Sequence, residues 1–110
     1  MAFKSAFVIM APDGDPKRHR ATIKTSKLEL VAVVVGLMNF DQAVDVCKNL
    51  VQNEGVQAII LCPGFHHEAV ARVRNAVGQG VAVNVARGDV PSGMITGKIL
   101  AKEGWFPEGQ

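Results

Sequence analysis

The segment that most restricts the fold is the run from Leu28 to Leu37, whose centre is apolar at every position. Val31 through Val35 contains four valines and one alanine, so both faces of a strand formed here are apolar. This pattern is typical of a central strand in a parallel sheet that is covered on both sides. The segment therefore predicts a fold built on a parallel sheet.

Strand-like and helix-like segments alternate along the rest of the chain. Three further short apolar runs predict strands over Ala6–Met10, Val56–Leu61 and Val81–Val85. Apolar residues at helical spacing predict two helices. The first is capped by Asn39, with Gln42 completing a capping box, and ends at Gly55; the second runs from about Phe65 to Val77. We expect an α/β domain of two or three layers with a mainly parallel four-stranded sheet, in the order β-loop-β-α-β-α-β.

At 110 residues the chain is long enough for one domain. We expect a core over residues 1–93 and a tail over residues 94–110 that packs on the core or on a neighbouring subunit. Three segments are less regular. Asp15 is suited to cap a single helical turn over Lys17–Arg20, and the segment Thr22–Lys27 has no clear pattern. In the tail, Ile95, Ile99 and Leu100 suit one short amphipathic turn.

The hydrophobic content of 48% is high for a chain of this size. Two clear helices leave one face of the predicted sheet bare unless a neighbouring copy covers it. Both observations predict a homo-oligomer.

Composition argues against several classes of partner and cofactor. The net charge is only +2, tyrosine is absent and no basic tract alternates with aromatic residues, so we expect no nucleic-acid partner. No apolar run approaches the roughly 18 residues of a membrane span, so we expect no membrane partner. No nucleotide-binding glycine motif or redox-cofactor motif is present, so we expect no cofactor.

Cys47 and Cys62 are isolated, and no small-residue cleavage pattern follows the apolar start of the chain. Reduced thiols in a cytoplasmic protein are therefore expected.

The turn from Leu61 to Glu68 is the first candidate site, because ligands of open α/β sheets bind beyond the carboxyl ends of strands. His67, Glu68 and His66 are candidates for acid/base chemistry, and Gly64 and Phe65 for ligand contacts. Adjacent histidines on a helix point about 100° apart, so one of the two can equally face solvent. Glu68 can equally act only on the helix dipole.

Cys62 lies beside this turn and is a candidate ligand contact. It could act as a nucleophile with His66 as its base, or be a packed, inert thiol.

Two other clusters follow strand ends. Arg87 is suited to hold a carboxylate or phosphate, and Asp89 to orient a histidine; the alternative is a surface ion pair. His19 and Arg20 suit an anionic ligand, and the alternative is a solvated basic turn. His19, His66 or His67, Cys62, Glu68 and Asp89 are the possible ligands of a metal ion, but no H-E-x-x-H spacing is present, so no metal is predicted.

Several of these motifs together resemble a known family. They are a first strand ending in Ala-Pro, the loop D-P-K-R-H-R, the turn Leu-Cys-x-Gly-Phe-x-His-Glu, and a final Val-x-Arg-x-Asp-Val. In this combination the chain, over roughly residues 4–93, resembles a family of small, functionally uncharacterised bacterial α/β proteins. The resemblance implies that His67 is more important than His66, and it implies no activity. The tail after Gly93 has no counterpart in the pattern.

The residues favour a small cofactor-independent enzyme of the lyase, isomerase or hydrolase type. His67 would act as acid and base on an anionic or carbonyl-bearing metabolite at the carboxyl edge of the sheet. A non-catalytic small-molecule sensor or carrier, and an oligomeric structural protein, are the alternatives.

Overall fold

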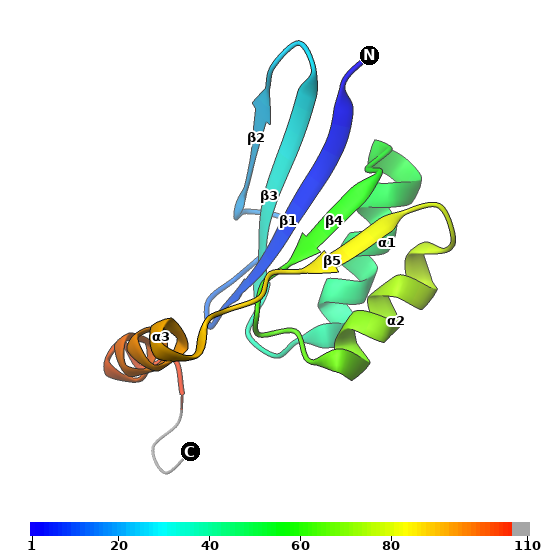
Figure 1. The fold of residues 1–110 in the computed structure, drawn as a ribbon. Helices are drawn as coiled ribbons and strands as arrows, with labels where there is room; N and C mark the ends of the chain where they lie inside the picture. Colours follow the sequence, from blue (N-terminus) through cyan, green and yellow to red (C-terminus); the bar gives the residue numbers. More distant parts are fainter. Residues whose placement is uncertain (107–110) are drawn as a thin grey trace.

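The computed structural model of the protein describes residues 1–106. These residues form five strands and three helices; the first three elements are strands, and helices and strands alternate after them (Figure 1). They are β1 (Phe3–Ala11), β2 (Arg20–Lys24), β3 (Leu28–Gly36), α1 (Phe40–Glu54), β4 (Ala58–Leu61), α2 (His67–Val77), β5 (Ala82–Val85) and α3 (Val90–Lys102). The predicted α/β class is confirmed.

The strands form one sheet in the order β2-β3-β1-β4-β5. β1 lies at its centre and pairs in parallel with β3 and β4, and β4 pairs in parallel with β5. The predicted sheet had four strands, and this number was wrong, because β2 adds an antiparallel edge strand beside β3.

β2 lies partly within the segment that the sequence left unassigned. Its residues alternate between polar and apolar, from Arg20 through Ile23 to Lys24, which is the pattern of a strand with two different faces, although all five residues are exposed at this edge. The turn that returns the chain to β3 is held by Thr25, whose hydroxyl accepts hydrogen bonds from the amides of Lys27 and Leu28. Upstream of β2, the carbonyl of Asp15 accepts the amides of Arg18 and His19, which gives a single turn; the predicted turn extended to Arg20, and this was wrong because Arg20 begins β2.

The helix ends follow the predicted caps with two changes. The Asn39 side chain accepts the amide of Gln42 at 3.1 Å, and Gly55 ends α1 in the left-handed conformation with φ of 74°. The Gln42 side chain accepts the amide of Gly36 at 2.7 Å instead of returning to Asn39, so it joins α1 to the end of β3. α2 begins at His67, two residues later than predicted, because His66 is its cap.

α1 and α2 pack side by side on one face of the sheet (Figure 1). The core lies between them and the sheet. It consists mainly of alternate strand residues, such as Val8, Val33 and Ile59, and of inward helix residues, such as Cys47, Leu50 and Val73. The described chain is therefore a two-layer domain with one covered face.

The C-terminal part of the described chain differs most from expectation. A helix of 13 residues, α3, replaces the single short turn predicted around Ile95 and Ile99. None of its residues is buried, and it stands apart from the sheet beyond the end of β5 (Figure 1). The predicted boundary at residue 93 falls inside α3. Residues 107–110 of the predicted tail lie outside the described residues.

Across residues 1–106, α1 is the longest helix, and none of the three is long and apolar enough to cross a membrane.

Candidate functional site

The four parallel strands end at one edge of the sheet, where the loops pack closely on each other. The carbonyl of Ala11, at the end of β1, accepts the amides of Gly14 and Leu37 at 3.0 and 2.9 Å. Gly14 lies so near the carbonyl of Val35 that a side chain here would collide with it. The start of the β1–β2 loop is thereby held against the end of β3.

Buried contacts hold the turn between β4 and α2 in place. The amide of Cys62 continues the sheet by donating to the carbonyl of Val8, and Cys62 itself is buried. Phe65 is buried and meets Phe40 of α1 edge to face, with 5.6 Å between ring centroids. Gly64 packs against the methyl group of Met10. These contacts fix the turn that presents the first residues of α2.

His66 serves first as the N-cap of α2. Its Nδ1 accepts the amide of Ala69 at 3.1 Å, and its ring meets Phe40 at 4.7 Å between centroids. Since Nδ1 accepts a hydrogen bond, the neutral imidazole carries its proton on Nε2. His66 therefore has one ring nitrogen committed to the fold and one donor left for a ligand.

His67 and Glu68 occupy the exposed first turn of α2. Within residues 1–106 neither side chain makes a hydrogen bond or an ion pair. Together with three neighbours they line an open pocket of about 510 Å³, which we call the α2 pocket: Pro63, Phe65, His66, His67 and Glu68. The pocket therefore presents two imidazoles and a carboxylate at a helix N-terminus.

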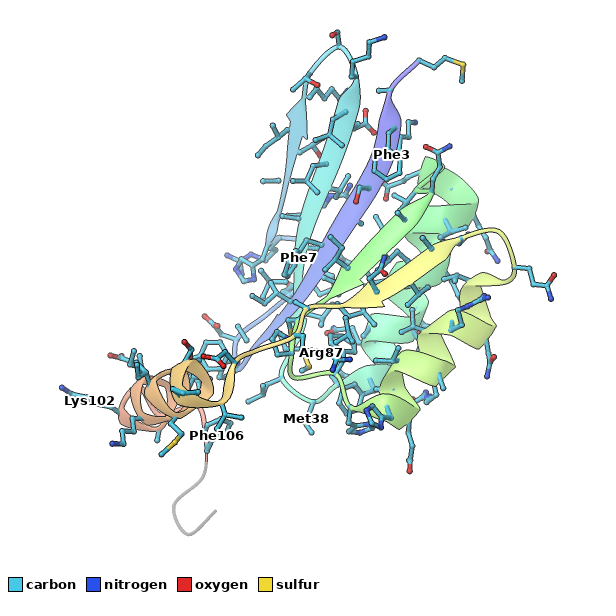
Figure 2. The ribbon with its side chains drawn as sticks, in the orientation of Figure 1. Phe3, Phe7, Met38, Arg87, Lys102 and Phe106 are labelled. Atoms are coloured by element: carbon cyan, nitrogen blue, oxygen red, sulfur yellow. The ribbon has the colours of Figure 1, made fainter. Side chains whose placement is uncertain are left out.

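The remaining predicted residues do not line the α2 pocket. Arg87 and Asp89 lie exposed on the linker that joins β5 to α3 (Figure 2), and the side chain of Asp89 makes no capping bond to α3. His19 lies near the end of β3, where its Nδ1 accepts the amide of Asp15 at 3.0 Å. Within residues 1–106 no three histidine, cysteine, aspartate or glutamate side chains lie together in a group that could hold a metal ion.

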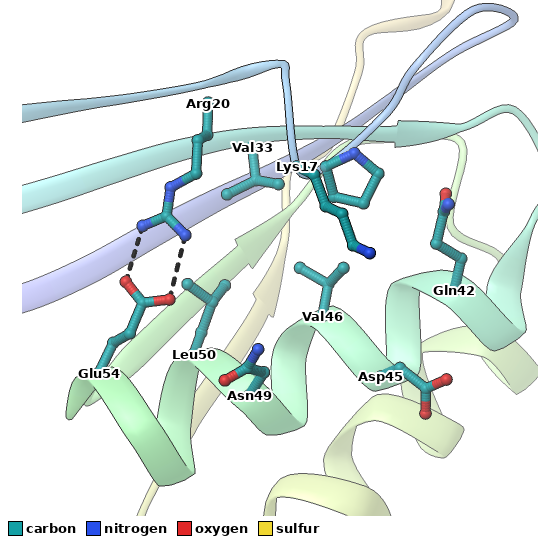
Figure 3. Close-up of a pocket in the computed structure, with 10 residues that line it drawn as sticks. Lys17, Arg20, Val33, Gln42, Asp45, Val46, Asn49, Leu50 and Glu54 are labelled. Carbon is teal, nitrogen blue, oxygen red and sulfur yellow. Dashed lines mark hydrogen bonds and ion pairs between the residues drawn. The ribbon is translucent and has the colours of Figure 1, made fainter.

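Arg20 belongs to a second cavity. This cavity of about 670 Å³, which we call the β2–α1 groove, lies between the β2 side of the sheet and α1 (Figure 3). Its lining combines apolar and polar side chains: Pro16, Lys17, Arg20, Val33, Gln42, Asp45, Val46, Asn49, Leu50 and Glu54.

An ion pair closes one end of the groove. The Arg20 guanidinium donates two hydrogen bonds to the Glu54 carboxylate, at 3.1 and 2.7 Å (Figure 3). This pairing lowers the pKa of Glu54 and raises that of Arg20. Sequence reasoning missed the groove because it depends on β2. The polar–apolar alternation of residues 20–24 was the signal that could have placed Arg20 on the α1 side.

Comparison with known proteins agrees with the resemblance drawn from the motifs. No curated protein and no solved structure matches the chain significantly. A family model described as a family of unknown function (DUF6506) matches residues 3–99, which includes most of α3 as well as the whole sheet. The chain therefore belongs to this family of unknown function.

Proposed function

We propose that this protein binds a small anionic or carbonyl-bearing molecule in the α2 pocket and acts on it by acid/base chemistry without a cofactor. The observation that carries the proposal is the side chain of His67, an exposed imidazole with no protein partner in the described chain, in a pocket at the end of β4. Imidazole exchanges protons near neutral pH, which suits a general acid or base.

The surroundings of His67 supply the other groups that such chemistry needs. The first-turn amides of α2 and the Nε2–H of His66 are donors that favour an anion or a developing oxyanion. Glu68 lies next to His67 in the lining of the pocket and would supply the carboxylate of the site. Asp89, which lies on the linker to α3 outside the lining, would reach the imidazole only through a movement of that linker. Arg87 would add positive charge at the same edge of the sheet.

A non-catalytic binder is the second candidate, and the openness of the α2 pocket favours it. Five residues from one turn line the pocket, so water has free access to any bound molecule. Enzymes commonly exclude water from reacting groups, whereas a sensor or carrier has less need to do so. The two candidates use the same residues and differ in what His67 does.

A thermal-shift screen of the full chain tests the proposal. The probes are inorganic phosphate, phosphate esters, small carboxylates and keto acids. A compound at 100 times its Kd stabilises the protein by about 2.7 kcal/mol, which is readily seen for a domain of this size.

Two variants make the result specific. His67→Ala removes the free imidazole, whereas His66→Asn removes the other imidazole and keeps a good helix cap. We expect a stabilising compound whose effect is lost or weakened in His67→Ala. Loss of turnover with binding retained indicates an enzyme, and loss of affinity alone indicates a binder. A compound that stabilises wild type and His67→Ala equally and that neither protein turns over, or no stabilising compound at all, contradicts the proposal.

A further inference from the structure

The β2–α1 groove lies where the sheet extends past the helix that covers it. β2 is the edge strand beside β3, and α1 packs on β3 (Figure 1). Arg20 of β2 lies opposite Val33 of β3 in the sheet register, so both side chains are on the face that α1 covers. Strand and loop residues therefore form one wall of the groove, and α1 forms the other (Figure 3).

The inner lining of the groove is apolar. Val33 and Leu50 are buried in the core. Val46 and Pro16, which also line the groove, are half-buried. The volume of about 670 Å³ falls in the range of roughly 300–1,000 Å³ that small-molecule sites occupy. The apolar part of a ligand would be removed from water here, which favours binding.

Two amide side chains of α1 add hydrogen-bond donors, because the oxygen of each is already in use. The Gln42 oxygen accepts the backbone amide of Gly36. The Asn49 oxygen accepts a hydrogen bond from the side chain of Asn53, and Figure 3 shows the Asn49 nitrogen turned toward the sheet. Within residues 1–106 the side-chain nitrogens of Gln42 and Asn49 donate no hydrogen bond, so both are available to a ligand.

Two cationic side chains come from the opposite wall. Lys17, in the loop before β2, extends toward α1, and within residues 1–106 its ammonium forms no ion pair (Figure 3). Arg20 is paired with Glu54, but the pair uses only two N–H groups of the guanidinium and leaves the others free. Lys17 therefore supplies an unbalanced positive charge, and Arg20 supplies further donors.

The carboxylates of the lining do not cancel this excess of donors. Both oxygens of Glu54 accept hydrogen bonds from Arg20. Asp45 lies at the outer rim, and Figure 3 shows its carboxylate pointing away from Lys17. The inner groove thus combines an apolar surface with donors from four side chains. This combination suits a ligand that has an apolar body and a negatively charged acceptor group.

We propose that the β2–α1 groove is a second ligand site, which takes a small monocarboxylate with an apolar body. The ammonium of Lys17 would bind the carboxylate, and the amides of Gln42 and Asn49 would add hydrogen bonds. The apolar body would lie on Val46 and Leu50, away from water. The groove and the α2 pocket share no lining residue, so this site is independent of the function proposed above.

The charges of the groove favour a single negative charge on the ligand. Lys17 is the one cation of the lining that has no ion-pair partner in the described chain, and it balances one carboxylate. A phosphate ester carries nearly two negative charges at neutral pH, so one of them would stay unbalanced near the carboxylates of Asp45 and Glu54. We therefore expect a carboxylate to bind more tightly than a phosphate ester with the same body.

Matched probes test the two requirements by NMR titration of the backbone amides of the full chain. Hexanoate has the apolar body and the single charge, acetate has the charge alone, 1-hexanol has the body alone, and hexyl phosphate has the body with a larger charge. We expect hexanoate to shift the amides around Lys17, Val46 and Leu50 in a saturable way. Acetate and 1-hexanol should bind about tenfold more weakly or worse, because each lacks one of the two contacts.

Single substitutions assign the binding to the groove. Lys17→Ala removes the unpaired ammonium, keeps the backbone bond of this residue to Asp15, and should weaken hexanoate binding about tenfold. Lys48→Ala, which removes an exposed lysine of α1 outside the lining, is the matched control and should change nothing. Asp45→Asn removes a carboxylate from the rim and should tighten binding about twofold. His67→Ala should leave hexanoate binding unchanged, because His67 lines the α2 pocket.

Four results would overturn the proposal. Equal binding of hexanoate by Lys17→Ala and Lys48→Ala means that the charge of Lys17 does not hold the ligand. If 1-hexanol or hexyl phosphate binds as tightly as hexanoate, the groove does not select a monocarboxylate. Shifts confined to residues 63–68 and lost in His67→Ala place hexanoate in the α2 pocket, which supports the function proposed there and not this site. The absence of a saturable shift with any probe rules out the groove as a site for this class of ligand and leaves the α2 pocket to its own test.

Discussion

The two faces of the sheet are made of the same kinds of residue but have opposite environments. Val8 and Ile59 point toward the helices and are fully buried, whereas Ile9 and Ile23 point the other way and are 41% and 62% exposed. The strands are therefore specified for burial on both sides, but α1 and α2 cover only one. The apolar strand pattern predicts cover on both faces, and in the described chain only one face has it.

The largest difference between the faces should appear in matched isoleucine truncations. Ile59→Ala removes a fully buried side chain from the covered face and should lower the free energy of unfolding by about 2–5 kcal/mol. Ile9→Ala, on the adjacent central strand, should cost about 1 kcal/mol or less in the isolated monomer. Urea unfolding at low protein concentration measures both.

The same pair also tests the homo-oligomer predicted from the sequence. If a second copy covers the face of the sheet that points away from α1 and α2, the cost of Ile9→Ala should grow as the protein concentration rises, because only the oligomer buries this side chain. The cost of Ile59→Ala should change little. Equal costs at low concentration would mean that the two faces do not differ as described.

The covered part of the molecule was the part that sequence reasoning predicted well. The boundaries of β3, α1 and α2 lie within two residues of expectation, because buried apolar periodicity and strong caps such as Asn39 and Gly55 act locally. The fold class, the parallel pairing and the open second face all follow from these elements.

The missed elements have short or weak local patterns. β2 has every residue exposed, so its strand state comes from pairing with β3 rather than from burial. α3 contains glycines at 93 and 97 and a weak separation of polar and apolar sides, so the sequence showed only a turn.

The turn of the candidate site joins a strand to a helix, as predicted, but the cap role of His66 was not foreseen. Histidine is not among the usual N-cap residues, and its ring is held by Phe40 from another element. The pairing of Arg20 with Glu54 likewise joins residues 34 positions apart. Contacts of this kind appear only once the fold is known.

A second comparison contrasts two glycines on loops at the carboxyl edge. Gly14→Ala would press a methyl group against the backbone of Val35, which cannot move without disturbing β3, and should cost roughly 1–3 kcal/mol. Gly88→Ala, in the linker to α3, meets open space and should be nearly neutral. Thermal unfolding compares the two. A neutral Gly14→Ala would show that the loop is not held against the sheet.

The ionisation of the Cys47 thiol tests how completely α1 excludes water from the covered face of the sheet. Burial raises the pKa of this thiol to about 12, from an ordinary value of 9.0. Because the folded pKa lies above the unfolded one, the folded state keeps its proton between these values. The stability due to the neutral thiol is complete below about pH 9 and falls as the pH rises toward 12, by about 1.4 kcal/mol per unit.

Urea unfolding at several pH values from 8 upward, set against Cys47→Ala, isolates this effect. We expect the wild type to lose stability faster than the variant above about pH 9, while the two lose it equally below. Parallel losses across the whole range would mean that solvent reaches Cys47 and that the covered face is not sealed there.

The smallest effect is expected where the helix cover ends, at the Arg20–Glu54 pair. Both side chains are about one third exposed, so solvent screens the pair and Glu54→Gln should cost about 0.2–1 kcal/mol at neutral pH. Because the pair lowers the pKa of Glu54, its contribution is present above the ordinary glutamate pKa of 4.5 and is lost as the pH falls through the lower folded value. Asp41→Asn, which breaks the more exposed Arg72–Asp41 pair, is the control and should cost less. Acid titration of stability should therefore bring wild type and Glu54→Gln together at low pH. If Glu54→Gln is still less stable than wild type at low pH, Glu54 holds β2 against α1 through packing rather than charge. The cover that α1 gives the sheet would then extend to the edge strand without the ion pair.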